Sequence, residues 1–289
     1  MEIICLQTET SSAEISLVGG EVTRWQFKNE DLLWKPDSTY WRRTSPILFP
    51  VIGWLNNDGI IIHGRRRPMT VHGFAKTSSF SVINQTETDA TIELGPSAET
   101  ADLYPFEFRL RIQYRLSLSA LNTAVEVFNI GPDRMPYGFG IHPGFRWPLP
   151  RARGMQHSLS FASQESDCVP AVTAEGYICR EQRQIPFDGK TLLLKPALFE
   201  HDVLCFLNAK SSSVTFTDGR LQAITVTSKN LPHWGIWSKP GAEFLCIQSW
   251  TSYGDAPDFA NSIYEKPSMI ILEAGTSQCH SVEWRYHPC

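Results

Sequence analysis

Two histidines lie in short segments whose neighbouring residues would let a ligand approach the imidazole. His72 directly precedes Gly73, and His142 stands between Gly140 and Pro143. Glycine lets the backbone come close to a ligand, and proline fixes the chain that follows. Imidazole exchanges a proton near neutral pH, so both histidines are candidates for acid–base chemistry. For each of them, a buried structural histidine is the alternative interpretation.

Strands are the elements that would position these histidines, because apolar and polar residues alternate along the chain. Between Phe106 and Leu118 the even positions are apolar or aromatic and the odd positions are polar, which predicts a strand with one buried face. Residues 214–217 and 221–227 flank Asp218-Gly219, a pair that favours the tight turn of a hairpin.

Helical patterns are weak, since 19 glycines and 19 prolines are spread along the sequence. Further turn signals lie at residues 57–59 and 188–189. We therefore expect an all-β protein, namely a large antiparallel β-sandwich with few short helices, forming a single domain over residues 1–289.

Composition excludes several classes of function. The formal net charge of −4 lacks the basic balance of a nucleic-acid-binding protein. No apolar stretch is long enough to span a membrane, and the first residues lack the pattern of a signal peptide. The seven cysteines show no C-x-x-C spacing, which indicates reduced thiols rather than disulfides or a zinc site. We expect a cytoplasmic protein without a metal or other cofactor.

Three segments carry a family resemblance, namely TVHGFAK at 70–76, GIHPGF at 140–145 and FLCIQSW at 244–250. In content and order they resemble segments of the aldose 1-epimerase (galactose mutarotase) superfamily, particularly its shorter bacterial LacX-like branch. The resemblance implies a galactose mutarotase-like supersandwich with a sugar cleft across one concave sheet. It also implies a small-molecule aldose as partner. The implied reaction interconverts the α and β anomers by ring opening and closure, which needs two proton transfers and no cofactor.

The resemblance also implies roles for individual residues. His142 matches the histidine that protonates the ring oxygen, and His72 matches one that hydrogen-bonds the sugar near that oxygen. Asp202 matches an aspartate that binds sugar hydroxyls, although a solvated surface aspartate is the other interpretation. Lys76 stands where the branch commonly has arginine, so we expect it to bind the substrate with a positive charge but without arginine's planar fork.

Two positions depart from the family pattern. The family's base is a glutamate, and the matching residue here is Gln248, whose amide cannot take a proton but can still hydrogen-bond the anomeric hydroxyl. Trp54 replaces an arginine that points into the sugar site, so its ring could either stack on the sugar or belong to the core. If another group replaces the base, Asp255, Asp258 and His233 are candidates from the same region of the sequence.

Three functions follow from these residues. The favoured one is an aldose 1-epimerase-like isomerase. A hexose-6-phosphate mutarotase is the second, and it would need a phosphate-binding group, for which Arg65 to Arg67, Arg151 and Arg153 are candidates. The third is a carbohydrate-binding protein without turnover, which the glutamine at 248 and the tryptophan at 54 support.

Overall fold

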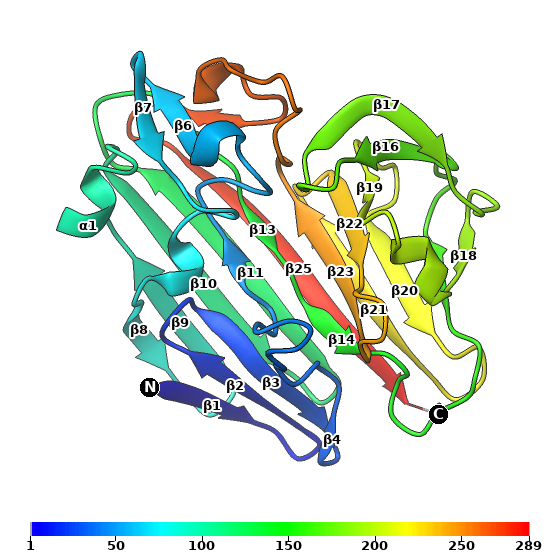
Figure 1. Ribbon diagram of the computed structural model, residues 1–289. Helices are drawn as coiled ribbons and strands as arrows, with labels where there is room; N and C mark the ends of the chain where they lie inside the picture. Colours follow the sequence, from blue (N-terminus) through cyan, green and yellow to red (C-terminus); the bar gives the residue numbers. More distant parts are fainter. Residues whose placement is uncertain (1, 289) are drawn as a thin grey trace.

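The computed structural model describes residues 2–288, and most of its elements are antiparallel strands (Figure 1). In the largest sheet, which has nine strands, β25 (Ser277–Pro288) lies between β21 (Gln222–Lys229) and β11 (Ala120–Asn129). Beyond β11 follow β10 (Phe108–Leu116), β9 (Asp89–Leu94) and β8 (Ser81–Gln85). Beyond β21 follow β20 (Ser213–Thr217), β15 (Ser158–Phe161) and β18 (Thr191–Leu193).

Two further sheets complete the main architecture. The six-stranded sheet runs in the order β19 (Leu204–Phe206), β22 (His233–Trp237), β23 (Phe244–Trp250), β13 (Gly140–Ile141) and β5 (Ile47–Leu48), and β14 (Gly144–Arg146) also pairs with β23. The four-stranded sheet contains β1 (Ile3–Gln7), β2 (Ser11–Ser16), β3 (Glu21–Phe27) and β4 (Glu30–Asp31).

The two smaller sheets pack against the nine-stranded sheet through aromatic side chains. Trp284 of β25 contacts Trp25 of β3 and Phe145 of β14, with ring centroids 6.0 Å and 5.5 Å apart. Next to β5, Phe49 contacts Phe108 of β10 at 5.2 Å. Such large buried rings dominate the energetics of a core. The layers confirm the predicted antiparallel β-sandwich.

Short elements connect the sheets. Three two-stranded pairs join β6 (Gly59–Ile62) to β7 (Arg65–Pro68), β12 (Met135–Tyr137) to β24 (Ile270–Leu272), and β16 (Cys168–Val172) to β17 (Ile178–Gln184). The helices are α1 (Ala98–Ala101) and the 3₁₀ turns η1 (Asn56–Asp58), η2 (Ala75–Thr77), η3 (Pro196–Phe199) and η4 (Ile263–Glu265). Across residues 2–288, none of the helices has the length and apolar character needed to cross a membrane.

The two strand predictions made from the sequence are confirmed in their centres. In β10 the even-numbered side chains are buried, but Leu118, which was expected to continue the strand, is 57% exposed beyond its end. The hairpin pairs β20 with β21, and Gly219 in its turn has φ of 75°. The oxygen Oδ1 of Asp218 accepts the backbone N–H groups of Arg220, Leu221 and Gln222. The expected division into one domain over the whole chain stays a prediction.

Candidate active site

A cavity of about 340 Å³ opens against the six-stranded sheet and gathers most of the residues that the sequence singled out. Strand β23 contributes Gln248 and Trp250, β22 contributes Trp237, and His142 follows the end of β13. Loops contribute further polar and aromatic side chains, namely Trp41, Trp54, His72 and Asp202. The cavity thus combines imidazole, amide and carboxyl groups with aromatic faces.

His72 is held by a turn with left-handed backbone, where φ is 65° at His72 and 73° at Gly73. A Cβ on Gly73 would come within 2.2 Å of the Phe49 carbonyl oxygen, so the turn requires glycine. The N–H of Gly53 donates to Nδ1 of His72 at 3.1 Å. Because an accepting ring nitrogen carries no proton, neutral His72 has its proton on Nε2. Burial, with a smaller effect of the Lys76 charge, lowers the pKa of His72 to about 3.

His142 stands among three rings. Its imidazole packs against Trp41 at 4.9 Å between centroids, and the rings of His72 and Trp237 meet it edge-on at 5.6 Å and 5.9 Å. Its exposed fraction is 6%, and Nδ1 is buried without a hydrogen-bond partner among residues 2–288. Burial, and then the neighbouring His72, holds the pKa of His142 well below its usual value. At neutral pH, the cavity therefore contains two neutral imidazoles in edge-on contact.

Gln248 lies in the middle of β23 with its side chain in the cavity lining. Its oxygen Oε1 accepts the indole N–H of Trp250 at 3.2 Å. Since an indole N–H can only donate, this contact assigns the orientation of the amide and leaves its NH₂ group to donate to a ligand. The Trp250 ring lies over Gly235 of the paired strand, where a Cβ would come within 2.2 Å of it.

Asp202 and Trp54 reach the cavity from loops on its rim. Asp202 follows η3 with φ of 65°, and its Oδ1 accepts the N–H of Val203 at 2.6 Å. Partial burial raises the pKa of Asp202. Trp54 is 45% exposed, so the core interpretation of this residue is wrong. Its ring lies over Gly176, which has φ of 91° and where a Cβ would come within 2.2 Å of the indole.

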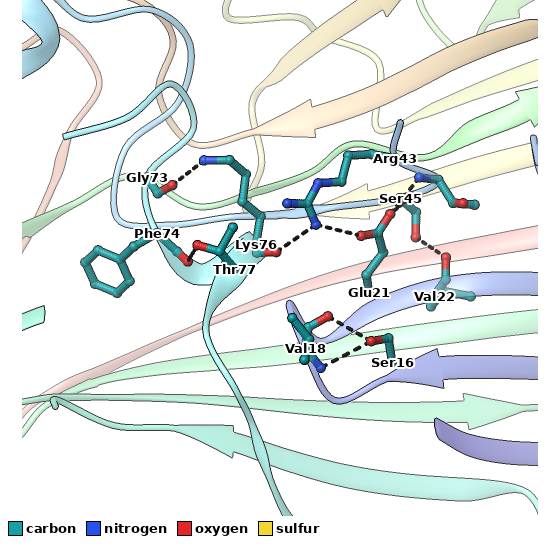
Figure 2. Close-up of polar contacts among 11 residues, drawn as sticks. Ser16, Val18, Glu21, Val22, Arg43, Ser45, Gly73, Phe74, Lys76 and Thr77 are labelled. Carbon is teal, nitrogen blue, oxygen red and sulfur yellow. Dashed lines mark hydrogen bonds and ion pairs between the residues drawn. The ribbon is translucent and has the colours of Figure 1, made fainter. Parts of the chain in front are cut away.

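Lys76 does not line this cavity, in contrast to the contact with substrate expected from the sequence. The 3₁₀ turn η2 directs its ammonium back onto the turn that carries His72. There Nζ donates to the carbonyl of Gly73 (Figure 2). It also donates to the carbonyl of Val71 and to the hydroxyl of Thr70. Its own carbonyl accepts from Arg43 at 2.8 Å. Lys76 thus stabilises the turn that contains His72.

The three side chains considered as replacement bases all lie outside the cavity lining. Asp255 forms a buried ion pair with Lys266. Asp258 forms an exposed ion pair with Arg180 at 3.1 Å. His233 is fully buried, and its Nδ1 accepts a backbone N–H at 2.9 Å. Their proximity in sequence to Gln248 did not bring them to the site, because His233 lies fully buried on β22 and the chain after β23 places the two aspartates in ion pairs.

Sequence reasoning missed the two tryptophans that pack on His142. Trp41 precedes the first segment of the family pattern, and Trp237 ends a strand outside it, so no motif marked them. Near the other two motifs, Trp250 lines the cavity, whereas Trp147 packs on Phe199 at 6.1 Å instead. Within residues 2–288 no group of three His, Cys, Asp or Glu side chains could hold a metal ion, and the expectation of a protein without metal stays a prediction.

Comparison with known proteins adds family evidence to this geometry. A family model described as aldose 1-epimerase matches residues 2–284. The plasmid-encoded protein LacX of Lactococcus lactis subsp. lactis is 30% identical over 286 residues, covering 94% of this chain and 96% of its own. A crystal structure of a galactose mutarotase-like protein from Lactobacillus casei is similar with a TM-score of 0.92 at 25% identity, over 99% of this chain and 100% of that one. The structure of a galactose mutarotase related enzyme from Lactobacillus acidophilus also has a TM-score of 0.92 at 25% identity, over 99% and 97% of the two chains.

Proposed function

Because this chain belongs to the aldose 1-epimerase family, we propose that it is an isomerase that interconverts the α and β anomers of an aldose. One observation carries the proposal, namely the contact of two imidazoles, the half-buried His72 and the buried His142, at 5.6 Å in a cavity lined by tryptophans. Ring opening needs a base for the anomeric hydroxyl and an acid for the ring oxygen. The cavity offers both functions without the family's glutamate.

His142 carries both proton transfers in this proposal. Its Nδ1 is buried, so Nε2 is the nitrogen available to the substrate. With the neutral imidazole protonated on Nδ1, Nε2 takes the proton of the anomeric hydroxyl. The C1–O5 bond then breaks as the C1=O1 bond forms, and the same proton passes to O5. Both oxygens are bonded to C1, so one imidazole can serve them in turn. Rotation about C1–C2 and the reverse steps give the other anomer.

The neighbouring groups bind and orient the sugar. The Nε2–H of His72 donates to O5, where negative charge develops as the ring opens. The NH₂ group of Gln248 donates to the anomeric oxygen. Asp202 accepts from sugar hydroxyls, and the faces of Trp54 and Trp237 pack on the C–H side of the ring. All these side chains line the same cavity.

A carbohydrate-binding protein without turnover is the second candidate, and the glutamine at 248 favours it. Its hydrogen bond to Trp250 is compatible with binding alone. A hexose-6-phosphate mutarotase lacks comparable support, because none of the arginines considered for phosphate binding lines the cavity. Arg67 donates to a backbone carbonyl, and Arg151 and Arg153 pair with carboxylates.

The test is the mutarotation of freshly dissolved α-D-glucose and α-D-galactose, followed by polarimetry or anomer-resolved NMR. We expect the wild type to accelerate equilibration of at least one sugar above the buffer rate. The His142→Ala variant should lose about a hundredfold or more of this rate, because it lacks the group that transfers the proton. Circular dichroism checks that the variant is folded. A wild-type protein that binds sugar without accelerating equilibration would favour the second candidate instead.

A further inference from the structure

A second hollow lies next to the cavity. This groove, of about 470 Å³, shares Asp202 and Trp237 with the cavity lining. The two spaces are therefore adjacent at these two residues. Of the groove residues, only Asp202 has a role implied by the family resemblance.

Four segments form the walls of the groove. One is the turn that contains Tyr40, another is the segment of Glu200 and His201 after η3, the third is the connection from β22 to β23 with Lys239, and the fourth is the chain after β16 with Thr173 and Ala174. The first and third segments contact each other. The Lys239 ammonium lies 3.4 Å from the carbonyl oxygen of Tyr40, and a Cβ on Gly241 would touch the Tyr40 hydroxyl at 3.4 Å. The groove is thus bounded by packed segments.

The chemistry of the lining matches a sugar unit. Tyr40 and Trp237 are half-buried and offer aromatic faces, which pack on the apolar side of a pyranose ring. Glu200 and Asp202 accept hydrogen bonds from hydroxyls, and Lys239 donates. The two carboxylates stand beside one lysine and His201, so the groove carries no net positive charge to attract a phosphate. A neutral saccharide is therefore favoured over a phosphorylated one.

We propose that the groove binds a second sugar unit, so that the substrate is the reducing end of a disaccharide or longer oligosaccharide. The reducing sugar would occupy the cavity beside His142, and the glycosidic bond would pass between Asp202 and Trp237. This proposal rests on the proposed function, because it places the anomeric carbon at the two imidazoles. It assigns specificity to Tyr40, Glu200 and Lys239, which take no part in proton transfer.

The test compares dissociation constants from isothermal titration calorimetry. The ligands are glucose, galactose, glucose 6-phosphate and four disaccharides with glucose at the reducing end, namely cellobiose, maltose, lactose and isomaltose. The groove variant carries Tyr40→Ala and Lys239→Ala. The control is Lys190→Ala, which removes an exposed lysine outside both hollows.

We expect at least one disaccharide to bind about tenfold more tightly than glucose. The groove variant should bring its Kd back to that of glucose, with the Kd for glucose itself unchanged within twofold and no effect of Lys190→Ala. The proposal is overturned if glucose binds but no disaccharide binds more tightly, or if the groove variant leaves the disaccharide Kd unchanged. The proposal is also overturned if glucose 6-phosphate binds more tightly than glucose and the groove variant abolishes this difference in Kd. Absence of binding by every sugar would remove the proposed function as well.

Discussion

At the scale of the residue, the proposed chemistry depends on the protonation states of two imidazoles and on the orientation of one amide. Burial lowers the pKa of His72 to about 3 and holds the pKa of His142 well below its usual value, so both rings are neutral. The hydrogen bond from Gly53 leaves Nε2 of His72 as a donor. The sequence predicted both histidines through their motifs. It could not predict their tautomers, because these depend on contacts from a distant loop.

Gln248→Glu should raise the rate of mutarotation about tenfold or more, because it adds a carboxylate base at the position of the amide. The indole N–H of Trp250 can still donate to it. The new rate should fall at low pH as the carboxylate is protonated. Polarimetry measures the effect, and Gln113→Glu, the same change at an exposed site on β10, is the control. A rate equal to or below that of the wild type, with sugar affinity kept, would contradict the role given to this position.

At the scale of the element, short turns position several residues of the site, and glycines in these turns allow other groups to pack closely against the backbone. The alternation of β10 and the Asp-Gly hairpin were predictable because both depend on neighbouring residues. The direction of Lys76 was not, since it depends on η2 folding back over the turn of His72. For the same reason, the sequence could not show that Asp255, Asp258 and His233, the candidate replacement bases, lie outside the cavity lining. Their positions follow from the tertiary paths of β22 and of the chain after β23, and not from their distance in sequence.

Gly176→Ala should weaken sugar binding about tenfold or more. The added Cβ would come within 2.2 Å of the Trp54 indole and would have to adopt a φ of 91°, so the ring must move from the cavity rim. Gly154→Ala is the matched control, because it has a similar φ of 81° and nothing within 4 Å of the added Cβ. Calorimetric titration with the sugar gives both values. Equal losses in the two variants would mean that backbone strain alone is responsible.

At the scale of the whole molecule, the sandwich buries several imidazoles in neutral form, which makes its stability depend on pH. Burial lowers the pKa of His72 to about 3 and the pKa values of His233 and His280 to about 4. In the unfolded chain the pKa of histidine is about 6.5. Below that pH the unfolded chain binds protons that the folded protein excludes, so stability is lost as the pH falls from about 6.5 towards the folded-state values.

The free energy of unfolding should therefore decrease between pH 7.5 and pH 5, with His72 alone contributing about 2 kcal/mol. Urea denaturation at the two pH values measures it, and a constant m-value shows that the same transition is compared. A denaturation midpoint that stays constant or rises on acidification would show that these imidazoles are accessible to protons in the folded protein.

The sequence was sufficient for the architecture, since period-two patterning and turn residues are local properties. It was insufficient for the cavity, where side chains from β22, β23 and several loops meet. Trp41 and Trp237 close around His142 from regions without a motif. The groove beyond Asp202 is likewise a property of four segments that are distant in the chain.

The pH dependence of the enzyme-catalysed mutarotation rate tests the central claim most directly. It is measured between pH 5.5 and 8 by anomer-resolved NMR, after subtraction of the buffer rate and with folding checked at each pH. Because burial lowers the pKa of His72 to about 3 and holds the pKa of His142 well below its usual value, we predict a rate that stays constant within about twofold. A rate that never exceeds the buffer rate, or one that falls about tenfold per pH unit below 6.5, would contradict catalysis by a neutral imidazole pair.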